Sequence, residues 1–363
     1  MNIQQLDKRS LTESFLVDDV QENRVRKYLG GETYDYISKF VDFDDEGTKV
    51  IETSSAFNID LINDPVANIV NIKRVNFIRF LNKFFEAVNK KLPHGGLFIG
   101  KGETIMERRK TIYKKFPKYL APIFYFLDFV FHRVLPKWTP TKKLYFLLTK
   151  GNNRVLSKAE ILGRVISCGF EIVEEAELNN KLIFVARKVK EPAFDKSPSY
   201  GPLFKMRRVG KNGKTIHVYK LRTMHPYSEY LQEYMFNKYN LKKGGKLAND
   251  FRITNWGKLM RKLWVDEFPM FINFFKGELK LVGVRPLSFH FFGLYNEELK
   301  KKRLKTKPGL IPPFYADLPK TLGEVMQSEE RYLDSYEKHP IWTDFKYFWL
   351  AMYNIFVKRA RSA

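Results

Sequence analysis

The sequence has only one cysteine, no apolar run long enough for a clear membrane span, and no glycine-rich nucleotide-binding loop. With Cys168 alone, an intramolecular disulfide framework and a cysteine-rich zinc site are excluded, and the chain fits a reducing compartment. The first 29 residues are polar and charged, so we expect no secretory signal peptide. Hydrophobic residues nevertheless make up 44% of the 363 positions, which is enough to fill two domain cores.

Negative charge is also scarce. Lysine and arginine number 64 against 40 acidic residues, for a net charge of +24, and most of this excess follows residue 195. Such a field favours an anionic partner, which could be nucleic acid, an anionic membrane leaflet or a phosphorylated substrate. The sequence shows no zinc-finger spacing, no RNA-recognition motif and no clear helix-turn-helix, so we expect no nucleic acid. Clustered aromatic residues favour the membrane interface.

Residues 1–195 predict an α/β domain that begins with a polar helix and two short strands, in KVIETSSAF and IDLI. Apolar residues at three- and four-residue spacing predict a long helix over 66–92, and the strand LFIG follows a Pro-His-Gly-Gly stop. Ser157 is the expected N-cap of a second helix, which ends at Gly169. The segments FEIVEEAEL and KLIFVARK predict a terminal hairpin.

This order of elements resembles the back half of a class I methyltransferase-like fold. A functional methyltransferase would place a glycine-rich loop after its first strand, whereas this chain offers only Gly30-Gly31 in a polar context. We therefore expect no S-adenosylmethionine binding, and a structural or regulatory role for this degenerate domain.

The segment YLAPIFYFLDFVFHRVL, residues 119–135, is the most apolar stretch of the chain. It is shorter than the roughly 20 apolar residues of a membrane span. Flanking cations suit a helix in the membrane interface, and a helix buried in the N-terminal domain is the alternative. The flanking cations are Lys115, Lys118, Arg133, Lys137, Lys142 and Lys143.

After a Pro- and Ser-rich linker at 192–202, residues 203–224 predict a basic hairpin with its turn at 211–213. Farther on, Asp266 and Glu267 precede the helix FPMFINFFKG, which they could simply cap. Their setting indicates phosphoryl chemistry instead, because guanidinium and ammonium groups bind phosphate and a carboxylate can act as nucleophile, base or metal ligand. The cations around them are Arg252, Lys258, Arg261, Lys262 and Arg285.

Six ordered motifs over about 110 residues of this second domain, 196–363, resemble bacterial sugar transferases, the monotopic polyprenyl-phosphate phosphoglycosyl transferases. They are GPxFKxxRVGxNGK at 201–214, KxRTM at 220–224, DxRxTxxGxxxR at 250–261, DExP at 266–269, NxxKGExxLVGxRP at 273–286 and KPG at 307–309. The resemblance implies an α+β domain with interfacial helices, at the cytoplasmic face of a bacterial inner membrane.

The resemblance also implies a reaction, in which a sugar 1-phosphate moves from a UDP-sugar to polyprenyl phosphate to initiate a membrane-linked glycan. Asp266 would be the nucleophile and form an aspartyl-phosphosugar intermediate. Mg²⁺ would bind the diphosphate, with Asp266 and Glu267 as its candidate ligands. The candidate phosphate-binding and substrate-binding residues are Lys220, Arg222, Arg252, Arg285 and Asp334.

The chain departs from the family pattern in several places. The long apolar helix expected directly before Gly201 is replaced by polar residues, so the segment at 119–135 is the candidate membrane contact. The last helix, IWTDFKYFWLAMYNIFVKRAR, suits either the interface or a packed core. Met270, Val284 and Pro312-Pro313 depart from the usual residues, which bears on sugar and nucleotide preference. Two rival functions remain, an S-adenosylmethionine-dependent methyltransferase and a non-catalytic membrane-associated scaffold.

Overall fold

The computed structural model describes residues 22–63, 65–194, 201–238 and 250–358. The chain forms two compact α/β units. The N-terminal unit comprises Met1–Tyr200 together with His225–Asn237, and the C-terminal unit comprises Gly201–Met224 together with Lys238–Ala363. Within the described ranges, no helix is both long enough and apolar enough to cross a membrane.

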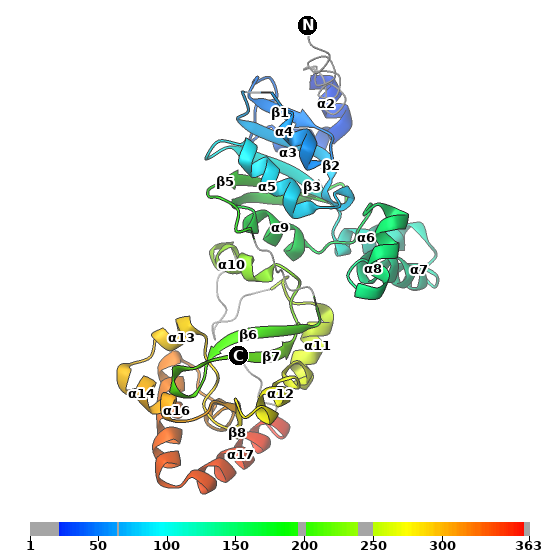
Figure 1. The fold of residues 1–363 in the computed structure, drawn as a ribbon. Coiled ribbons are helices and arrows are strands. Elements are labelled where there is room, and N and C mark those ends of the chain that lie inside the picture. The colour runs from blue at the N-terminus through cyan, green and yellow to red at the C-terminus, as the bar shows by residue number, and fades with distance from the viewer. Residues whose placement is uncertain (1–21, 64, 195–200, 239–249, 359–363) are drawn as a thin grey trace. The chain divides into compact units, whose positions relative to one another are not determined.

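A five-stranded sheet forms the centre of the N-terminal unit, in the order β1-β2-β3-β5-β4 (Figure 1). Strands β1 (Thr48–Ile51), β2 (Asn68–Arg74) and β3 (Leu97–Gly102) are parallel. Strand β5 (Lys181–Lys188) lies antiparallel between β3 and β4 (Phe170–Leu178). The predicted LFIG strand and terminal hairpin are confirmed, whereas the likeness to methyltransferases stays an interpretation of the element order.

The predicted long helix over 66–92 is wrong in its first half. Residues 68–74 form β2, and the helix α5 begins only at Leu81 and ends at Lys91. Ile69, Val70 and Ile72 are buried because β2 lies inside the sheet and helices cover both faces of the sheet, so the alternating pattern of a strand is lost. The predicted IDLI strand is also wrong, since the short helix α4 (Ala56–Asp60) occupies its start.

Helices cover both faces of this sheet. On one face, α2 (Glu22–Leu29) and α3 (Gly31–Ile37) pack their apolar residues against β2, β3 and β5. The other face carries α5 and α9 (Lys158–Ser167), beneath a cluster of aromatic rings that includes Phe84, Phe85, Phe98, Phe170 and Phe184. Ser157 caps α9 as predicted, because its hydroxyl accepts the Glu160 N–H at 3.1 Å.

Helices α6 (Ile105–Lys115), α7 (Ala121–Phe129) and α8 (Thr139–Thr149) lie together beside the sheet (Figure 1). A π-helical turn, η2 (Val130–Val134), continues α7. Arg108 of α6 holds Asp128 of α7 through two hydrogen bonds of 2.6 and 2.5 Å. Ala121 is the one buried residue of α7. The helix predicted over 119–135 is therefore present, and most of its large apolar side chains are exposed, whereas Arg133 is buried.

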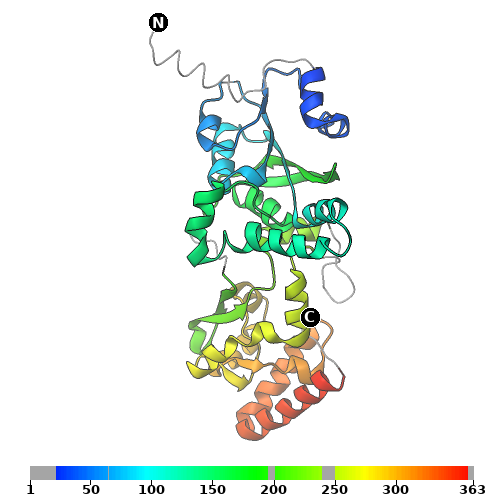
Figure 2. The same ribbon diagram turned by 90° about the vertical axis from the view of Figure 1, so that its right-hand side faces the viewer.

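The C-terminal unit is built around two small sheets (Figure 2). Strands β6 (Leu203–Val209) and β7 (Thr215–Leu221) form the predicted antiparallel hairpin, with Asn212 of its turn at a φ of 56°. Strands β8 (Lys280–Val282) and β9 (Gly309–Ile311) pair in parallel. The helices are α11 (Asn255–Leu263), α12 (Met270–Phe275), α13 (Phe289–Gly293), α14 (Glu297–Lys305), α15 (Phe314–Asp317), α16 (Leu322–Lys338) and α17 (Pro340–Phe356).

The last helix, α17, has two different faces. Tyr347, Ala351 and Ile355 are buried against α15, α16 and neighbouring strands. The opposite side exposes large apolar side chains, so core packing is confirmed for one face and the interfacial interpretation of the other stays a prediction. The exposed residues are Ile341, Trp342, Phe345, Trp349, Tyr353 and Phe356.

Candidate functional site

The carboxylates Asp266 and Glu267 lie on η5 (Val265–Glu267), a 3-10 turn between α11 and α12. They do not begin the following helix, because α12 starts only at Met270. Helix α11 ends at Leu263, and the next residue, Trp264, reverses the chain with a φ of 61°. The centre of the Trp264 ring lies 4.4 Å from that of Tyr315. This reversal sets the two carboxylates on a short turn, where neither is needed as a helix cap.

Glu267 forms an ion pair with Lys220, the last cation of β7. Both side chains are about one-fifth exposed. Lys220 was predicted to bind the diphosphate, and the structure brings it to the acidic pair. Because Lys220 forms its ion pair with Glu267, the neighbouring carboxylate of Asp266 can react with a substrate.

Burial raises the pKa of Asp266 above its usual value. The negative charge of Glu267 acts in the same direction, whereas Lys220 and Arg261 oppose the rise. A more basic carboxylate is a stronger nucleophile, and the neighbouring cations can neutralise phosphate charge as it approaches. Asp266 is only half-buried, so a substrate can reach it.

Arg252 is buried and its guanidinium is held by Asp250 in a bidentate pair of 2.8 and 2.7 Å. Although burial alone would raise the pKa of Asp250, the bonds and charge of Arg252 hold it below its usual value. Arg252 can therefore take part in phosphate binding only while sharing its guanidinium with Asp250.

Arg222 and Arg285 lie at other points of the C-terminal unit. The Arg222 Nε donates to the Gly201 carbonyl at 3.2 Å, and its guanidinium stacks over Phe204 at 4.9 Å. Arg285 is exposed, and its charge adds to burial in lowering the pKa of Arg208. Its carbonyl accepts a 2.5 Å bond from Arg303. Arg222 is thus held through its guanidinium and Arg285 through its main-chain carbonyl, and their roles at a phosphate stay predictions.

Asp334 lies on α16 and forms a 2.8 Å ion pair with Lys302 of α14. Lys302 also contacts Glu330 at 3.1 Å, so Asp334 belongs to a set of charges that links the two helices. None of the contacts among the described residues joins Asp334 to Asp266 or Glu267. This ion pair links α14 to α16, and a role of Asp334 at the substrate stays a prediction.

Asn273, which the sequence motifs did not mark as a site residue, supports the turn that carries Asp266 and Glu267. It is fully buried on α12, and its amide oxygen accepts the Tyr219 N–H at 3.0 Å. Its amide nitrogen donates to the His217 carbonyl at 2.7 Å and to Glu278 at 2.6 Å. These bonds fasten the helix after the acidic pair to the strand that carries Lys220. The available signal was its place in the NxxKGE motif.

Gly257 and Thr223 form a second support. A Cβ on Gly257 would lie 2.0 Å from the Thr223 carbonyl oxygen, so α11 can approach the end of β7 only with glycine there. Thr254 caps α11 through a 2.8 Å bond to Gly257 N, and its own N–H bonds the Thr223 carbonyl at 3.0 Å. The α11 helix is thereby fixed beside β7.

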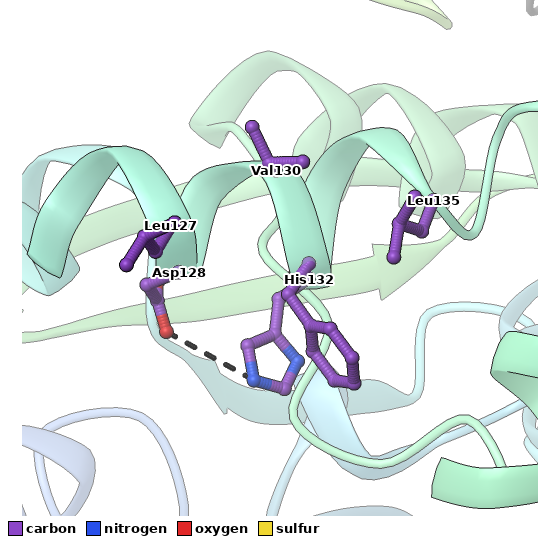
Figure 3. A pocket seen from close by; sticks show the side chains of 6 residues that line it. Leu127, Asp128, Val130, His132 and Leu135 are labelled. Carbon is purple, nitrogen blue, oxygen red and sulfur yellow. Dashed lines mark ion pairs between the residues drawn. The ribbon is translucent and has the colours of Figure 1, made fainter.

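A surface hollow also lies in the N-terminal unit, along α7 and η2 (Figure 3). Leu127, Val130 and Leu135 line it, and His132 approaches Asp128 at 3.9 Å. Burial and the charge of Arg108 lower the pKa of His132, so its imidazole is neutral. Since Asp128 is committed to Arg108, this hollow offers apolar contact rather than acid–base chemistry.

Residues 193–358 match the family model described as bacterial sugar transferase. The matched residues make up less than half of the chain, and we call them the sugar transferase region. The sugar transferase region contains both carboxylates and the whole of the C-terminal unit that the structure describes.

The chain is also similar to curated proteins. One is galactosyl transferase CpsE of Streptococcus agalactiae serotype III, with 34% identity over 152 residues, 40% of this chain and 33% of the relative. The chain is 37% identical over 116 residues to the undecaprenyl-phosphate galactose phosphotransferase of Salmonella typhimurium, 30% of this chain and 24% of that protein.

A longer match reaches into the N-terminal unit. The UDP-glucose:undecaprenyl-phosphate glucose-1-phosphate transferase of Escherichia coli is 27% identical over 240 residues, 61% of this chain and 44% of that protein. The chain spans less than half the length of the curated relatives described here.

Proposed function

We propose that the chain transfers a sugar 1-phosphate from a UDP-sugar to polyprenyl phosphate, and so initiates synthesis of a membrane-linked glycan. The observation that carries the proposal is Asp266, a half-buried carboxylate of raised pKa beside the Glu267–Lys220 pair, inside the sugar transferase region. The names of the relatives, which describe undecaprenyl-phosphate sugar phosphotransferases, support the same class of substrate.

In the first step, a carboxylate oxygen of Asp266 attacks the phosphorus that bears the sugar. The bond from that phosphorus to the bridging oxygen breaks, and UMP leaves with the oxygen. In the second step, a phosphate oxygen of the polyprenyl phosphate attacks the aspartyl-phosphosugar and releases the Asp266 carboxylate. Lys220 neutralises charge in both steps at the acidic turn, which is η5 with Asp266 and Glu267. Arg222, Arg252 and Arg285 are the further candidates for binding the diphosphate.

The carboxylates of Asp266 and Glu267 would suit Mg²⁺. In the described part of the chain, no group of three or more His, Cys, Asp or Glu side chains could hold a metal by itself. Mg²⁺ commonly binds through one or two carboxylates and the phosphates of its substrate. Glu267, with Asp266 beside it, would supply those carboxylates. Bound there, the ion would screen the diphosphate charge that repels an anionic nucleophile.

The test is incubation of the full chain with a panel of UDP-sugars and Mg²⁺, followed by intact-protein mass measurement. We expect a mass increase of one phosphosugar, equimolar UMP release, and loss of the adduct on adding polyprenyl phosphate. An adduct of unchanged yield in Asp266→Asn would refute the nucleophile. Release of no UMP from any UDP-sugar would favour the scaffold, and S-adenosylmethionine binding would favour the methyltransferase.

We also propose that α7, η2 and α8 contact an anionic membrane surface, where the lipid substrate resides. Exposed apolar side chains cover these helices, and exposed Lys115, Lys118, Lys142 and Lys143 lie among them, which suits anionic headgroups. The exposed apolar residues are Tyr119, Ile123, Phe124, Phe126, Leu127, Phe131, Trp138, Leu144, Leu147 and Leu148.

Sedimentation with liposomes tests this membrane contact. The double variant Leu147→Glu/Leu148→Glu places two charges on the exposed side of α8 and should reduce binding to vesicles that contain phosphatidylglycerol. Lys90→Glu, at an exposed position of α5, changes the net charge by the same amount and should bind nearly as well as the wild type. Equal losses in both variants would mean that only net charge matters, which would contradict a specific membrane-contacting surface.

A further inference from the structure

Arg208 of β6 and Arg285, which follows β8, are brought close together in the C-terminal unit. The Val209 N–H donates to the Leu287 carbonyl at 3.0 Å, so the end of β6 runs beside the segment that contains Arg285. Burial and the charge of Arg285 lower the pKa of Arg208, so the two guanidinium groups are close enough to repel each other. Like charges placed in this way cost free energy until an anion binds beside them.

Neither guanidinium has a carboxylate partner among the residues that the structure describes. The Arg208 guanidinium donates to the Arg207 carbonyl at 3.0 Å and to the Met206 sulfur at 3.1 Å. Both acceptors are neutral, so they orient the guanidinium without cancelling its charge. The Arg285 side chain is exposed and can be reached by a ligand from solvent.

The carboxylate nearest to this pair of arginines is already used. Glu329 of α16 forms a buried ion pair with Arg303 of α14. The Arg303 guanidinium also donates a 2.5 Å bond to the Arg285 carbonyl, which holds the main chain of Arg285 in place. Because Glu329 neutralises Arg303, the positive charges of Arg208 and Arg285 remain.

The two arginines lie apart from the acidic turn. In the β6–β7 hairpin, Arg208 is opposite Ile216, and Phe204 is opposite Lys220. Because Ile216 and Lys220 are four residues apart on β7, Arg208 and Lys220 lie on the same face of the hairpin, with their main chains about 13 Å apart along it. The end of the hairpin at Lys220 serves the acidic turn, and the end at Arg208 can hold a different anion.

We propose that Arg208 and Arg285 form a second anion site, which binds a phosphate group that Asp266 does not attack. Guanidinium groups bind phosphate oxygens through charge-assisted hydrogen bonds, and the bound phosphate relieves the repulsion between the two cations. A free phosphate ester and a lipid headgroup present the same oxygens to such a site. A use of this phosphate in the transfer reaction rests on the proposed function, whereas phosphate binding is measured without a UDP-sugar.

A phosphorus NMR titration of inorganic phosphate against the full chain tests the site. Arg208→Gln and Arg285→Gln should each weaken phosphate binding about tenfold, because each removes one charge-assisted partner. The double variant should lose less than the product of the two single effects, since both arginines hold one ligand. Arg207→Gln is the matched control, because Arg207 is the exposed neighbour of Arg208 and carries the same charge. It should bind phosphate within about twofold of the wild type.

Vesicles distinguish the two sources of phosphate. Sedimentation with vesicles that contain phosphatidate is compared with the titration at the same phosphate concentration. Tighter binding to the vesicles, weakened in Arg208→Gln and Arg285→Gln but kept in Arg207→Gln, would assign the site to a lipid phosphate. Binding of free phosphate with the same dependence on the two arginines, and no such dependence with vesicles, would assign it to a soluble phosphate ester.

Three results would overturn the second site. Equal losses in Arg207→Gln and Arg208→Gln would mean that phosphate responds only to net charge. An equal loss in Lys220→Gln would place the phosphate at the acidic turn. A wild-type chain that forms the phosphosugar adduct but does not bind phosphate would overturn the site and leave the proposed function standing. A chain that binds phosphate through Arg208 and Arg285 but forms no adduct with any UDP-sugar would refute the proposed function and support the site.

Discussion

Glu160 in the N-terminal unit and Asp266 in the C-terminal unit are both carboxylates among cations, but they differ in burial and pairing. Glu160 is fully buried and accepts bonds from Arg133 at 2.5 Å, Lys137 at 2.9 Å and Arg164 at 3.1 Å. Although burial alone would raise its pKa, these three cations hold it well below the usual value. Asp266 is half-buried, and its pKa is raised.

The two pKa directions follow from what each carboxylate has as a partner. Three direct cation contacts over-compensate the burial of Glu160, so this charge is fixed in the fold and has no capacity for a ligand. At the acidic turn, Lys220 is paired with Glu267, so burial outweighs the attraction felt by Asp266. Cations near a carboxylate therefore do not identify a reactive site by themselves. The carboxylate must also lack direct ion pairs with those cations and be accessible to a substrate.

Removing the charge of Asp266 should give the largest effect on activity. Asp266→Asn should lower the rate of adduct formation by at least about 10³-fold, because an amide cannot form the acyl phosphate. The raised pKa means that ionised Asp266 costs the fold free energy at neutral pH, so the variant should be as stable as the wild type or slightly more stable. Single-turnover mass measurement and thermal unfolding check the two parts.

Removing the charge of Glu160 should act on stability instead. Glu160→Gln leaves three cations around a neutral amide and should lower the free energy of unfolding by about 3–5 kcal/mol. Glu171→Gln is the matched control, since Glu171 pairs with Arg187 at 3.1 Å at a half-exposed position, where the expected loss is below about 1 kcal/mol. Urea unfolding of both variants measures the difference. Equal losses of unfolding free energy in the two variants would contradict the expected difference between the buried and the exposed ion pair.

Asn273→Ala should have a smaller effect on both properties. It leaves the Tyr219 N–H, the His217 carbonyl and Glu278 without their bonds, which should cost about 2 kcal/mol of stability. Because these bonds hold the acidic turn on β7, adduct formation should fall by about tenfold. Asn273→Asp tests the geometry, since it keeps the acceptor and loses both donated bonds. Full activity in Asn273→Ala would exclude this support.

Lowering the pH should affect Asp266 and Glu160 at different pH values, and it changes the protein least. Because the pKa of Asp266 is raised, this carboxylate becomes protonated, and can no longer act as a nucleophile, at a pH above the ordinary aspartate range. Glu160 has a lowered pKa, so its contribution is fully present above the unfolded value of about 4.3 and is lost only below it. Between neutrality and about pH 4, adduct formation should decline while circular dichroism stays unchanged. Coincident transitions would contradict this order.

Much of the fold could be predicted because several signals are local. Ser157 and Gly169 delimit α9, and a turn with Asn212 sets the β6–β7 hairpin. The error over 66–92 arose because Ile69 and Ile72 fit helical spacing as well as they fit a strand covered on both faces. Only the neighbouring strands decide between the two.

At the site, the sequence identified the acidic pair and the cations but not how they pair. That Lys220 neutralises Glu267 and that Asp334 belongs to a helix-linking set depend on contacts between residues far apart in the sequence. The spacing of residues along the chain does not predict such ion pairs. The support from Asn273 was visible only as one letter of a motif.

The segment His225–Asn237 also bears on how such proteins can be recombined. A cut at the start of the matched region, residue 193, would leave η4 (Ser228–Leu231), with its buried Leu231, without the helix α9 that it contacts. An exchange of N-terminal halves between homologues would have to carry a compatible partner for Tyr227, above all a glycine at the position of Gly163, where a Cβ would lie 2.3 Å from the Tyr227 carbonyl oxygen. The two units are therefore expected to be inherited together rather than shuffled as independent modules.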